Sequence, residues 1–247
     1  MSAETYLSEV KKLIAKIEAT QMENIKKVAE LVANAVIHER LVYVFGAGHS
    51  NILAIECFDR AGGLGNMQAM LDAGLDFSSG AGRQGGFERL PGYSPIIIKE
   101  YEIQAGDVII IASNSGRNPA PVQMALEAKK LGAIVVALTS MEHSKAVTSN
   151  DPSGKKLIDV ADIILDNGCP AGDAMVEFPN FLPKVGPGST VAGATILNCI
   201  VVQAANILLD KGIVPPVAIS GNLPSGKEFN EKYFRNHRQF VDKMKHR

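Results

Sequence analysis

The sequence predicts an α/β protein, a three-layer αβα sandwich built on a mostly parallel, doubly wound sheet. Three observations lead to this class. Short apolar runs alternate with helical patterns along the chain, the runs show no polar alternation, and polar loops that contain glycine follow several of them. Such runs are typical of strands buried on both faces of a parallel sheet. We expect one domain over residues 1–247, with an N-terminal helical arm (about 1–40) and a C-terminal tail (about 212–247).

Composition argues against several classes of function. The 247 residues carry a net charge of −1 and no basic block, so we expect no nucleic-acid partner. The N-terminus is charged and lacks the apolar run of a signal peptide. No Cys-x-x-Cys pair occurs, which indicates reduced thiols in the cytoplasm, without disulfides or a zinc site; the cysteines are Cys57, Cys169 and Cys199.

The N-terminal arm has the pattern of an amphipathic helix. Apolar residues such as Val10, Ile17 and Val32 approximate a helical stripe and predict helix over residues 3–38. The sequence Thr20-Gln21-Met22-Glu23 fits a capping box, so a break near Thr20 would divide the arm into two helices. Because so long an arm has little core of its own to cover, we expect it to pack on a second subunit as well as on the sheet.

The remaining elements follow in order. The predicted strands are Leu41–Phe45, Met67–Leu71, Val108–Ala112, Ala133–Leu138 and Ala161–Leu165, with Ala174–Phe178 as a candidate edge strand. Helices are expected after the first strand, over Tyr93–Ile103, over Pro119–Leu131, and from a cap at Ser189 or Thr190 through Leu209. The glycine-rich stretch 72–92 lacks periodicity, which is typical of an active-site rim or lid, or of an inert surface loop.

The stretch from Val191 to Leu209 is apolar enough to resemble a membrane span. Polar residues interrupt it at Thr195, Asn198, Gln203 and Asn206. We therefore expect a helix buried in a soluble core, and no membrane partner.

The clearest functional signal follows the third strand, in the sequence Ser113-Asn114-Ser115-Gly116-Arg117-Asn118. Asn118 stands at an N-cap position, and Pro119 occupies the first turn of the next helix. Free backbone N–H groups at the positive end of a helix, together with hydroxyl donors, suit a phosphate. The alternative is a helix cap that binds nothing. No Gly-x-x-x-x-Gly-Lys-Ser/Thr occurs, so this is not a nucleoside-triphosphate loop.

Two further polar loops follow predicted strands. The first, Gly46-Ala47-Gly48-His49-Ser50-Asn51, resembles a dinucleotide loop, but Asn51 occupies the third glycine position, so we expect no nicotinamide or other cofactor. The second begins at Thr139-Ser140. Because ligands bind at the carboxyl ends of strands in parallel sheets, the loops at 46–50, 113–118 and 139–144 are expected to form one site.

The motif Ser113-x-Ser115-Gly116-x-Asn118 resembles the phosphosugar loop of SIS (sugar isomerase) domains, and Gly46-x-Gly48-x-Ser50 resembles the loop after their first strand. Nearly the whole chain is similar to phosphoheptose-isomerase-like, single-domain SIS proteins. The resemblance implies a flavodoxin-like sheet, a phosphorylated sugar as ligand, and assembly into a homodimer or homotetramer. The phosphosugar-binding residues it implies are Gly46, Gly48, Ser50, Ser113, Asn114, Ser115, Gly116, Asn118 and Thr139.

The resemblance also suggests a reaction. Aldose–ketose isomerisation moves a proton between adjacent carbons through an enediol, and needs a base and an acid. The resembling isomerases use a Glu and a His. Glu56 is the first candidate base, although Arg60 lies four residues on and could hold it in a surface ion pair. Glu88 is the second candidate base, and His49 and then His143 are the candidate acids.

The long C-terminal helix departs from the phosphoheptose isomerases, in which it presents Glu or His to the site. Here it carries no Glu, Asp or His before Asp210, and its amides are poor zinc ligands, so no metal site is expected. Two alternatives to the isomerase therefore remain. One is a phosphosugar lyase of the N-acetylmuramate-phosphate etherase type. The other is a non-catalytic phosphosugar sensor, which would need the phosphate loop but neither Glu56 nor His49.

Overall fold

The core of the protein is a five-stranded parallel sheet with the strand order β2-β1-β3-β4-β5. The computed structural model describes residues 3–236, 240 and 243–245. The strands are β1 (Val42–Gly46), β2 (Met67–Met70), β3 (Val108–Ala112), β4 (Ile134–Thr139) and β5 (Ile163–Asp166). Every residue of β1, β2 and β3 is buried. Since strands covered on both faces need no polar alternation, the predicted parallel α/β sheet is confirmed.

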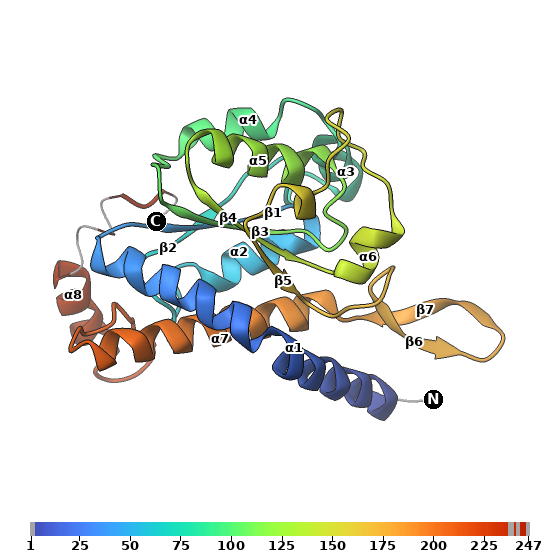
Figure 1. Cartoon of the computed structure of the whole chain (residues 1–247). Coiled ribbons are helices and arrows are strands. Elements are labelled where there is room, and N and C mark those ends of the chain that lie inside the picture. Colours follow the sequence, from blue (N-terminus) through green and yellow to red (C-terminus); the bar gives the residue numbers. More distant parts are fainter. Residues whose placement is uncertain (1–2, 237–239, 241–242, 246–247) are drawn as a thin grey trace.

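Helices cover both faces of the sheet (Figure 1). On one face lie α1 (Ala3–Ile37) and α2 (Asn51–Cys57), and on the other lie α4 (Ser94–Ile97) and α5 (Pro119–Lys130). The long helix α7 (Ser189–Asp210) packs outside this sandwich, on α1 and α2. Shorter helices are η1 (Gly48–Ser50), α3 (Ala81–Glu88), η2 (Ile98–Glu100), α6 (Met141–Ala146) and η3 (Leu157–Asp159).

Helix α7 is buried on one side only, which refines the expectation of a helix buried in the core. By length and composition it is the one helix in the described part of the chain that could cross a membrane. Ile196, Ile200 and Ala204 are fully buried on one side, whereas Val202 is 70% exposed on the other. The buried side packs on α1 and α2, as the inner face of an amphipathic helix does.

Helix α1 runs unbroken over 35 residues, so the predicted break near Thr20 is wrong. The Thr20 hydroxyl donates to the carbonyl of Lys16 inside the helix, at 2.8 Å, instead of capping a new one. The next turn covers the open edge of the sheet. Gln21 Oε1 accepts the N–H of Asp166 at 3.0 Å, and Asn24 Nδ2 donates to the carbonyl of Ile164 at 3.0 Å. These two amides satisfy backbone groups of β5 that would otherwise form an unpaired strand edge.

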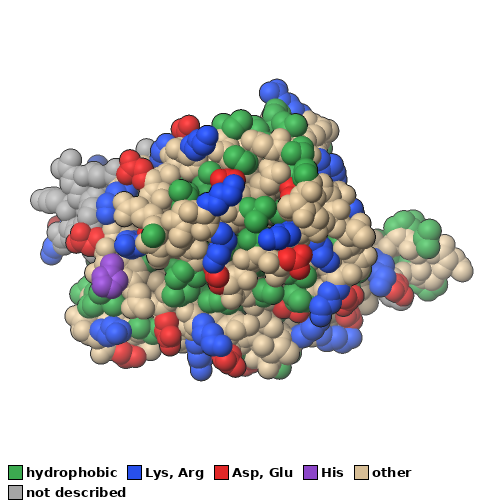
Figure 2. All heavy atoms as spheres, turned by 45° about the horizontal axis from the view of Figure 1, so that its top comes forward, with side chains coloured by type: hydrophobic (Ala, Val, Ile, Leu, Met, Phe, Trp, Pro, Cys, Tyr) green, Lys and Arg blue, Asp and Glu red, His purple; other side chains and the backbone are tan. Residues whose placement is uncertain are grey.

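The segment Ala174–Phe178 does form a strand, β6, but its prediction as an edge strand of the main sheet is wrong. It pairs with β7 (Phe181–Pro187) in an antiparallel hairpin that projects from the body of the molecule (Figures 1 and 2). The edge that β6 would have joined is occupied by α1. The sequence did not reveal β7 because two prolines and a glycine interrupt its pattern. Hydrophobic side chains lie open on the hairpin, and Leu182 is 99% exposed.

The stretch 72–92 contains one helix, α3, that its glycines concealed from sequence analysis. The helix lies beside η1 and α5, so it borders the loops that follow β1 and β3. The C-terminal tail folds back on the segment after α2 through a bridge between Leu64 and Val217, then forms α8 (Gly226–Asn236).

Candidate functional site

The loops after β1, β3 and β4 leave the sheet side by side. Gly46 pairs with Ala112, and Ala112 pairs with Leu138, so these three neighbouring strands end at the same level. Side chains from the loops after β1 and β3, from α2 and β4, and from two later segments line one small cavity. The lining residues are His49, Ser50, Leu53, Ser113, Asn114, Leu138, Asn167, Ser189 and Thr190.

The first loop turns tightly because two glycines allow it. A Cβ atom on Gly46 would lie 2.2 Å from the carbonyl oxygen of Ser50, and Gly48 has a φ of +58°. The N–H of Gly48 is held by the carbonyl of Leu75 at 2.8 Å. His49 is exposed, and its ring centroid lies 4.7 Å from that of Phe77. The loop thus presents His49 and Ser50 to the cavity on a fixed backbone.

The second loop is a backbone cradle. Gly116 has a φ of +59°, its N–H contacts Ser113 Oγ at 3.2 Å, and its carbonyl accepts the N–H of Leu157 at 2.8 Å. Among the hydrogen bonds found in the described residues, none uses the N–H of Asn114, Ser115 or Arg117. These donors precede α5 at its positive end, the arrangement that attracts an anion.

Asn118 occupies the N-cap position of α5 but makes no capping bond with its side chain. Its Nδ2 donates to Glu88 Oε1 at 2.7 Å, and its Oδ1 accepts from Asn150 at 3.0 Å. The other Glu88 oxygen accepts from Gln84 at 3.0 Å. Asn118 and Glu88, expected to bind the ligand and to act as a base, are thus joined to each other and support the second loop from α3.

Thr139 and His143 also surround the loop without lining the cavity. Thr139 is fully buried, and its hydroxyl donates to the carbonyl of Asn114 at 3.2 Å. His143 Nδ1 lies 3.5 Å from Asn114 Nδ2, and Asn167 Nδ2 donates to Asn114 Oδ1 at 2.9 Å. The side chain of Asn114 is therefore held between α6 and the end of β5.

Glu56 does not line the cavity. Its carboxylate pairs with Arg60 and accepts a hydrogen bond from Asn198 of α7 at 3.2 Å. The ion pair between residues four apart, which the sequence offered as the alternative to a catalytic base, is the contact that the structure contains.

Three polar lining residues were not predicted from the sequence as part of the site: Asn167, Ser189 and Thr190. Asn167 follows the end of β5, and this position at the carboxyl edge was the signal that could have found it. Ser189 or Thr190 was expected to cap α7, but Gly188 is the N-cap and Ser189 is the first helical residue. Its hydroxyl donates to Asp173, a contact between residues 16 apart that no local pattern announces.

The cavity is polar but carries little charge. His49 is the one ionisable residue among those that line it. Cys169 lies near the start of α7: a Cβ atom added to Gly188 would be 3.2 Å from its Sγ. Burial raises the pKa of this thiol to about 12, and the charges of Asp173 and Asp166 raise it further by smaller amounts. At neutral pH it is a thiol, a weak nucleophile. An anion at this site would be held by N–H and O–H donors.

Among the described residues, two other kinds of candidate site come into question: a second cavity and a metal site. A larger cavity, about 450 Å³, lies at the opposite end of the strands beside Val108, but its Arg40 is already bonded to Asp107 and to the carbonyl of Ala105. In the described part of the chain, no group of three or more His, Cys, Asp and Glu residues is placed to hold a metal ion.

Comparison with known proteins agrees with the fold. Residues 5–140 match the model of the SIS domain. Among solved structures, a phosphoheptose isomerase from Francisella tularensis superposes with a TM-score of 0.53 at 15% identity, covering 83% of this chain and 100% of that one. A phosphoheptose isomerase from Neisseria gonorrhoeae gives 0.51 at 14% identity, covering 83% and 95%. At these identities the likeness establishes the shared fold.

Two curated relatives match almost end to end. A UPF0309 protein from Halalkalibacterium halodurans is 39% identical over 226 residues, which is 92% of this chain and 93% of that protein. A UPF0309 protein from Caldanaerobacter subterraneus is 42% identical over 237 residues, 95% and 96%. The chain therefore belongs to the SIS-domain proteins and, within them, to the UPF0309 family.

Proposed function

We propose that this protein binds a phosphorylated sugar at the cavity and interconverts its aldose and ketose forms. The observation that carries the proposal is the cradle of free N–H groups at Asn114, Ser115 and Arg117, which opens beside the His49–Ser50 loop. A phosphate with a charge of about −1.5 to −2 at neutral pH suits donors at a helix start. Membership in the SIS-domain family and a fold shared with phosphoheptose isomerases support the same ligand class.

The proposed reaction is proton transfer through an enediol. A base removes the proton next to the carbonyl carbon, and the proton returns to the neighbouring carbon. Of the four candidates, His49 is the one that lines the cavity, so we assign it the proton transfer. Glu88 is tied to Asn118, and Glu56 to Arg60 and Asn198, so in this chain both carboxylates have structural partners.

We include a second copy of this chain among the partners, and the cytoplasm as the place of action. Apolar side chains are exposed on α2, where Ile55 is 53% exposed, and on the outer side of α7, where Val202 is 70% exposed. Apolar surface of this kind is typical of an interface between subunits. Sedimentation equilibrium of the full chain measures its association state. A monomer at micromolar concentration would argue against self-association.

The test of the function is thermal stability against a panel of pentose, hexose, heptose and amino-sugar phosphates. At a hundredfold excess over Kd, a ligand raises the unfolding free energy by about 2.7 kcal/mol. We expect wild type to respond to one phosphosugar. Ser115→Ala should weaken that response, because it removes a hydroxyl donor from the loop while keeping the N–H, and Ser8→Ala, on the exposed side of α1, should keep it in full. Absence of any response in wild type would sink the proposal.

Turnover separates the isomerase from its alternatives. With the phosphosugar that binds, we expect isomerisation, and His49→Gln should keep binding while turnover falls by about 10²-fold or more. Release of a cleaved acid or alcohol would indicate the lyase instead. Binding without any turnover would indicate the sensor.

A further inference from the structure

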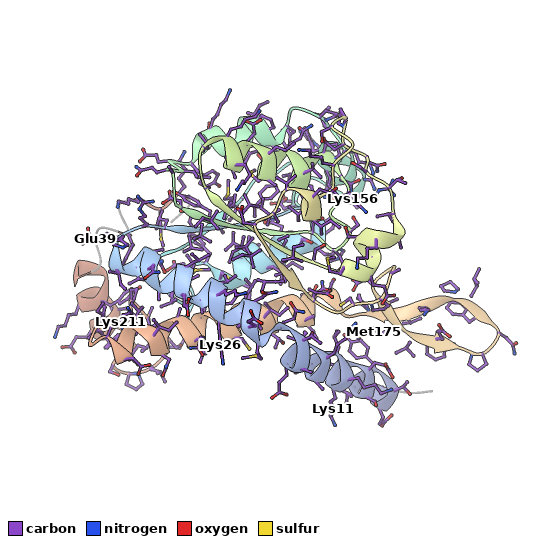
Figure 3. The ribbon with its side chains drawn as sticks, in the orientation of Figure 1. Lys11, Lys26, Glu39, Lys156, Met175 and Lys211 are labelled. Carbon is purple, nitrogen blue, oxygen red and sulfur yellow. The ribbon has the colours of Figure 1, made fainter. Side chains whose placement is uncertain are left out.

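The start of α7 is held by a carboxylate from the other end of the β6–β7 hairpin. Asp173 accepts the N–H of Gly188 at 3.1 Å and the N–H of Ser189 at 2.8 Å through Oδ1. Its Oδ2 accepts the Ser189 hydroxyl at 2.7 Å. Asp173 has a φ of +72°, a backbone conformation that few residues other than Gly, Asn and Asp adopt. Met175 lies at the root of the hairpin (Figure 3). A Cβ atom on Gly188 would lie 2.7 Å from the sulfur of Met175, so the root of the hairpin is closely packed.

This carboxylate accepts the N–H groups of Gly188, the N-cap, and Ser189, the first residue of α7. A phosphate would compete there with a fixed negative charge, so the start of α7 is not the phosphate end of the cavity. The loop after β3 offers N–H donors without such a carboxylate, at Asn114, Ser115 and Arg117. The cavity therefore has two chemically different sides: one next to the loop after β3, where Ser113 and Asn114 line it, and one where Ser189 and Thr190 contribute hydroxyl groups.

The direction of the Ser189 hydroxyl bond fixes what Ser189 can offer. An O–H group donates one hydrogen, and the bond to Asp173 uses it. Toward the cavity, which Ser189 lines together with His49 and Ser50, the oxygen offers lone pairs. It can accept a hydrogen bond from a ligand but cannot give one while Asp173 holds its proton.

We infer that Ser189, positioned by Asp173, accepts a hydrogen bond from a hydroxyl or amino group on the sugar part of the ligand. The site thereby selects phosphosugars that carry a donor at this position over those that lack one. The inference rests on the proposed function and adds to it the residue that reads the sugar while the loop 113–118 holds the phosphate.

The experiment compares two ligands in three proteins by calorimetric titration: the phosphosugar that wild type binds, and inorganic phosphate. We expect Ser189→Ala to weaken binding of the phosphosugar by about tenfold and to leave the Kd of inorganic phosphate unchanged. Ser189→Thr keeps the hydroxyl and should bind the phosphosugar within about threefold of wild type. Melting temperatures of the three proteins check that each is folded.

A series of singly deoxygenated or deaminated analogues gives the second readout. One analogue should bind wild type about tenfold more weakly than the parent sugar, yet bind wild type and Ser189→Ala equally, because its partner group is gone. Equal weakening of phosphosugar and inorganic phosphate by Ser189→Ala would place Ser189 at the phosphate and overturn the inference. An unchanged phosphosugar Kd would overturn it as well, while leaving the proposed function standing. If wild type binds no phosphosugar, the proposed function fails first, and this inference fails with it.

Discussion

Gly46 shows how a single residue sets the shape of the site. It ends β1, and a side chain there would collide with the backbone of Ser50, which is itself a lining residue. The clash would be with backbone atoms, which cannot rotate away as the end of a flexible side chain can. The first turn after the strand therefore admits only glycine.

We expect Gly46→Ala to cost several kcal/mol of unfolding free energy, because its Cβ would lie 2.2 Å from the Ser50 carbonyl oxygen. Gly86→Ala is the matched control. Gly86 lies inside α3 with no atom within 4 Å of an added Cβ, and the change should be neutral or stabilise by up to about 1 kcal/mol. Urea unfolding of both variants measures this. A Gly46→Ala protein as stable as wild type would contradict the packing described for this loop.

At this scale the sequence predicted positions better than roles. Ser50, Ser113, Asn114 and His49 line the cavity, and their loops could be found because each follows a buried strand. The sequence placed Thr139 beside the site. It did not predict that the Thr139 hydroxyl would face the backbone carbonyl of Asn114. The orientation of a side chain depends on neighbours distant in sequence, which a local motif does not contain.

At the scale of elements, α1 and β5 depend on each other. Gln21 and Asn24 are polar residues on the inner side of an amphipathic helix, where apolar residues are the rule. Their amides replace the strand that would otherwise pair with β5. The same contacts explain why β6 turns away from the sheet and pairs with β7.

We expect Gln21→Ala to destabilise the protein by about 1–3 kcal/mol, because the N–H of Asp166 would lose its acceptor in a partly buried position. Combined with Asn24→Ala, it should also increase aggregation on heating, since the edge of β5 would be open to pairing with other chains. Lys26→Ala, on the exposed side of α1 (Figure 3), is the control. Thermal unfolding followed by light scattering measures both effects, and equal curves for all variants would refute the role of the amides.

The five strands of the sheet could be predicted because each is a short apolar run between turn signals. The helix α3 and the strand β7 could not, because glycine and proline in them lower the local preference that the surrounding structure overrides. The unbroken course of α1 was missed for the opposite reason. Its Thr20-x-x-Glu23 sequence has the form of a capping box, yet packing along the whole helix outweighs it.

At the scale of the whole molecule, several buried or partly buried groups resist ionisation. Burial is the main cause that raises the pKa of Cys57, Cys169, Tyr93 and Tyr101 to about 12 each. Their ordinary values are 9.0 for the thiols and 10.0 for the phenols. Each pKa unit between the folded and unfolded states is worth about 1.4 kcal/mol.

The sign of the effect follows from linkage. A group whose pKa is higher in the folded state contributes stability that is complete below its unfolded pKa and is lost as pH rises toward the folded value. We therefore expect the unfolding free energy to fall between pH 9 and 12, the window given by these four groups. Cys57→Ala should flatten the decline, and Cys199→Ala, at a half-exposed position, should not. Urea titrations across this range measure the slope, and a constant free energy would be inconsistent with the buried thiol.

The β6–β7 hairpin leaves and re-enters the body at almost the same place. Ala174 pairs with Pro187, and Asp173 contacts Gly188 and Ser189. The five-stranded sheet therefore does not depend on the length of the chain between Ala174 and Pro187. A pair of residues fixed next to each other at the surface is a natural point for insertions and deletions. Relatives of this protein are thus free to lengthen, shorten or replace the hairpin while the rest of the fold stays in register. Divergence within the family is expected to concentrate in this segment, and its length can serve as a marker for sorting members into subgroups.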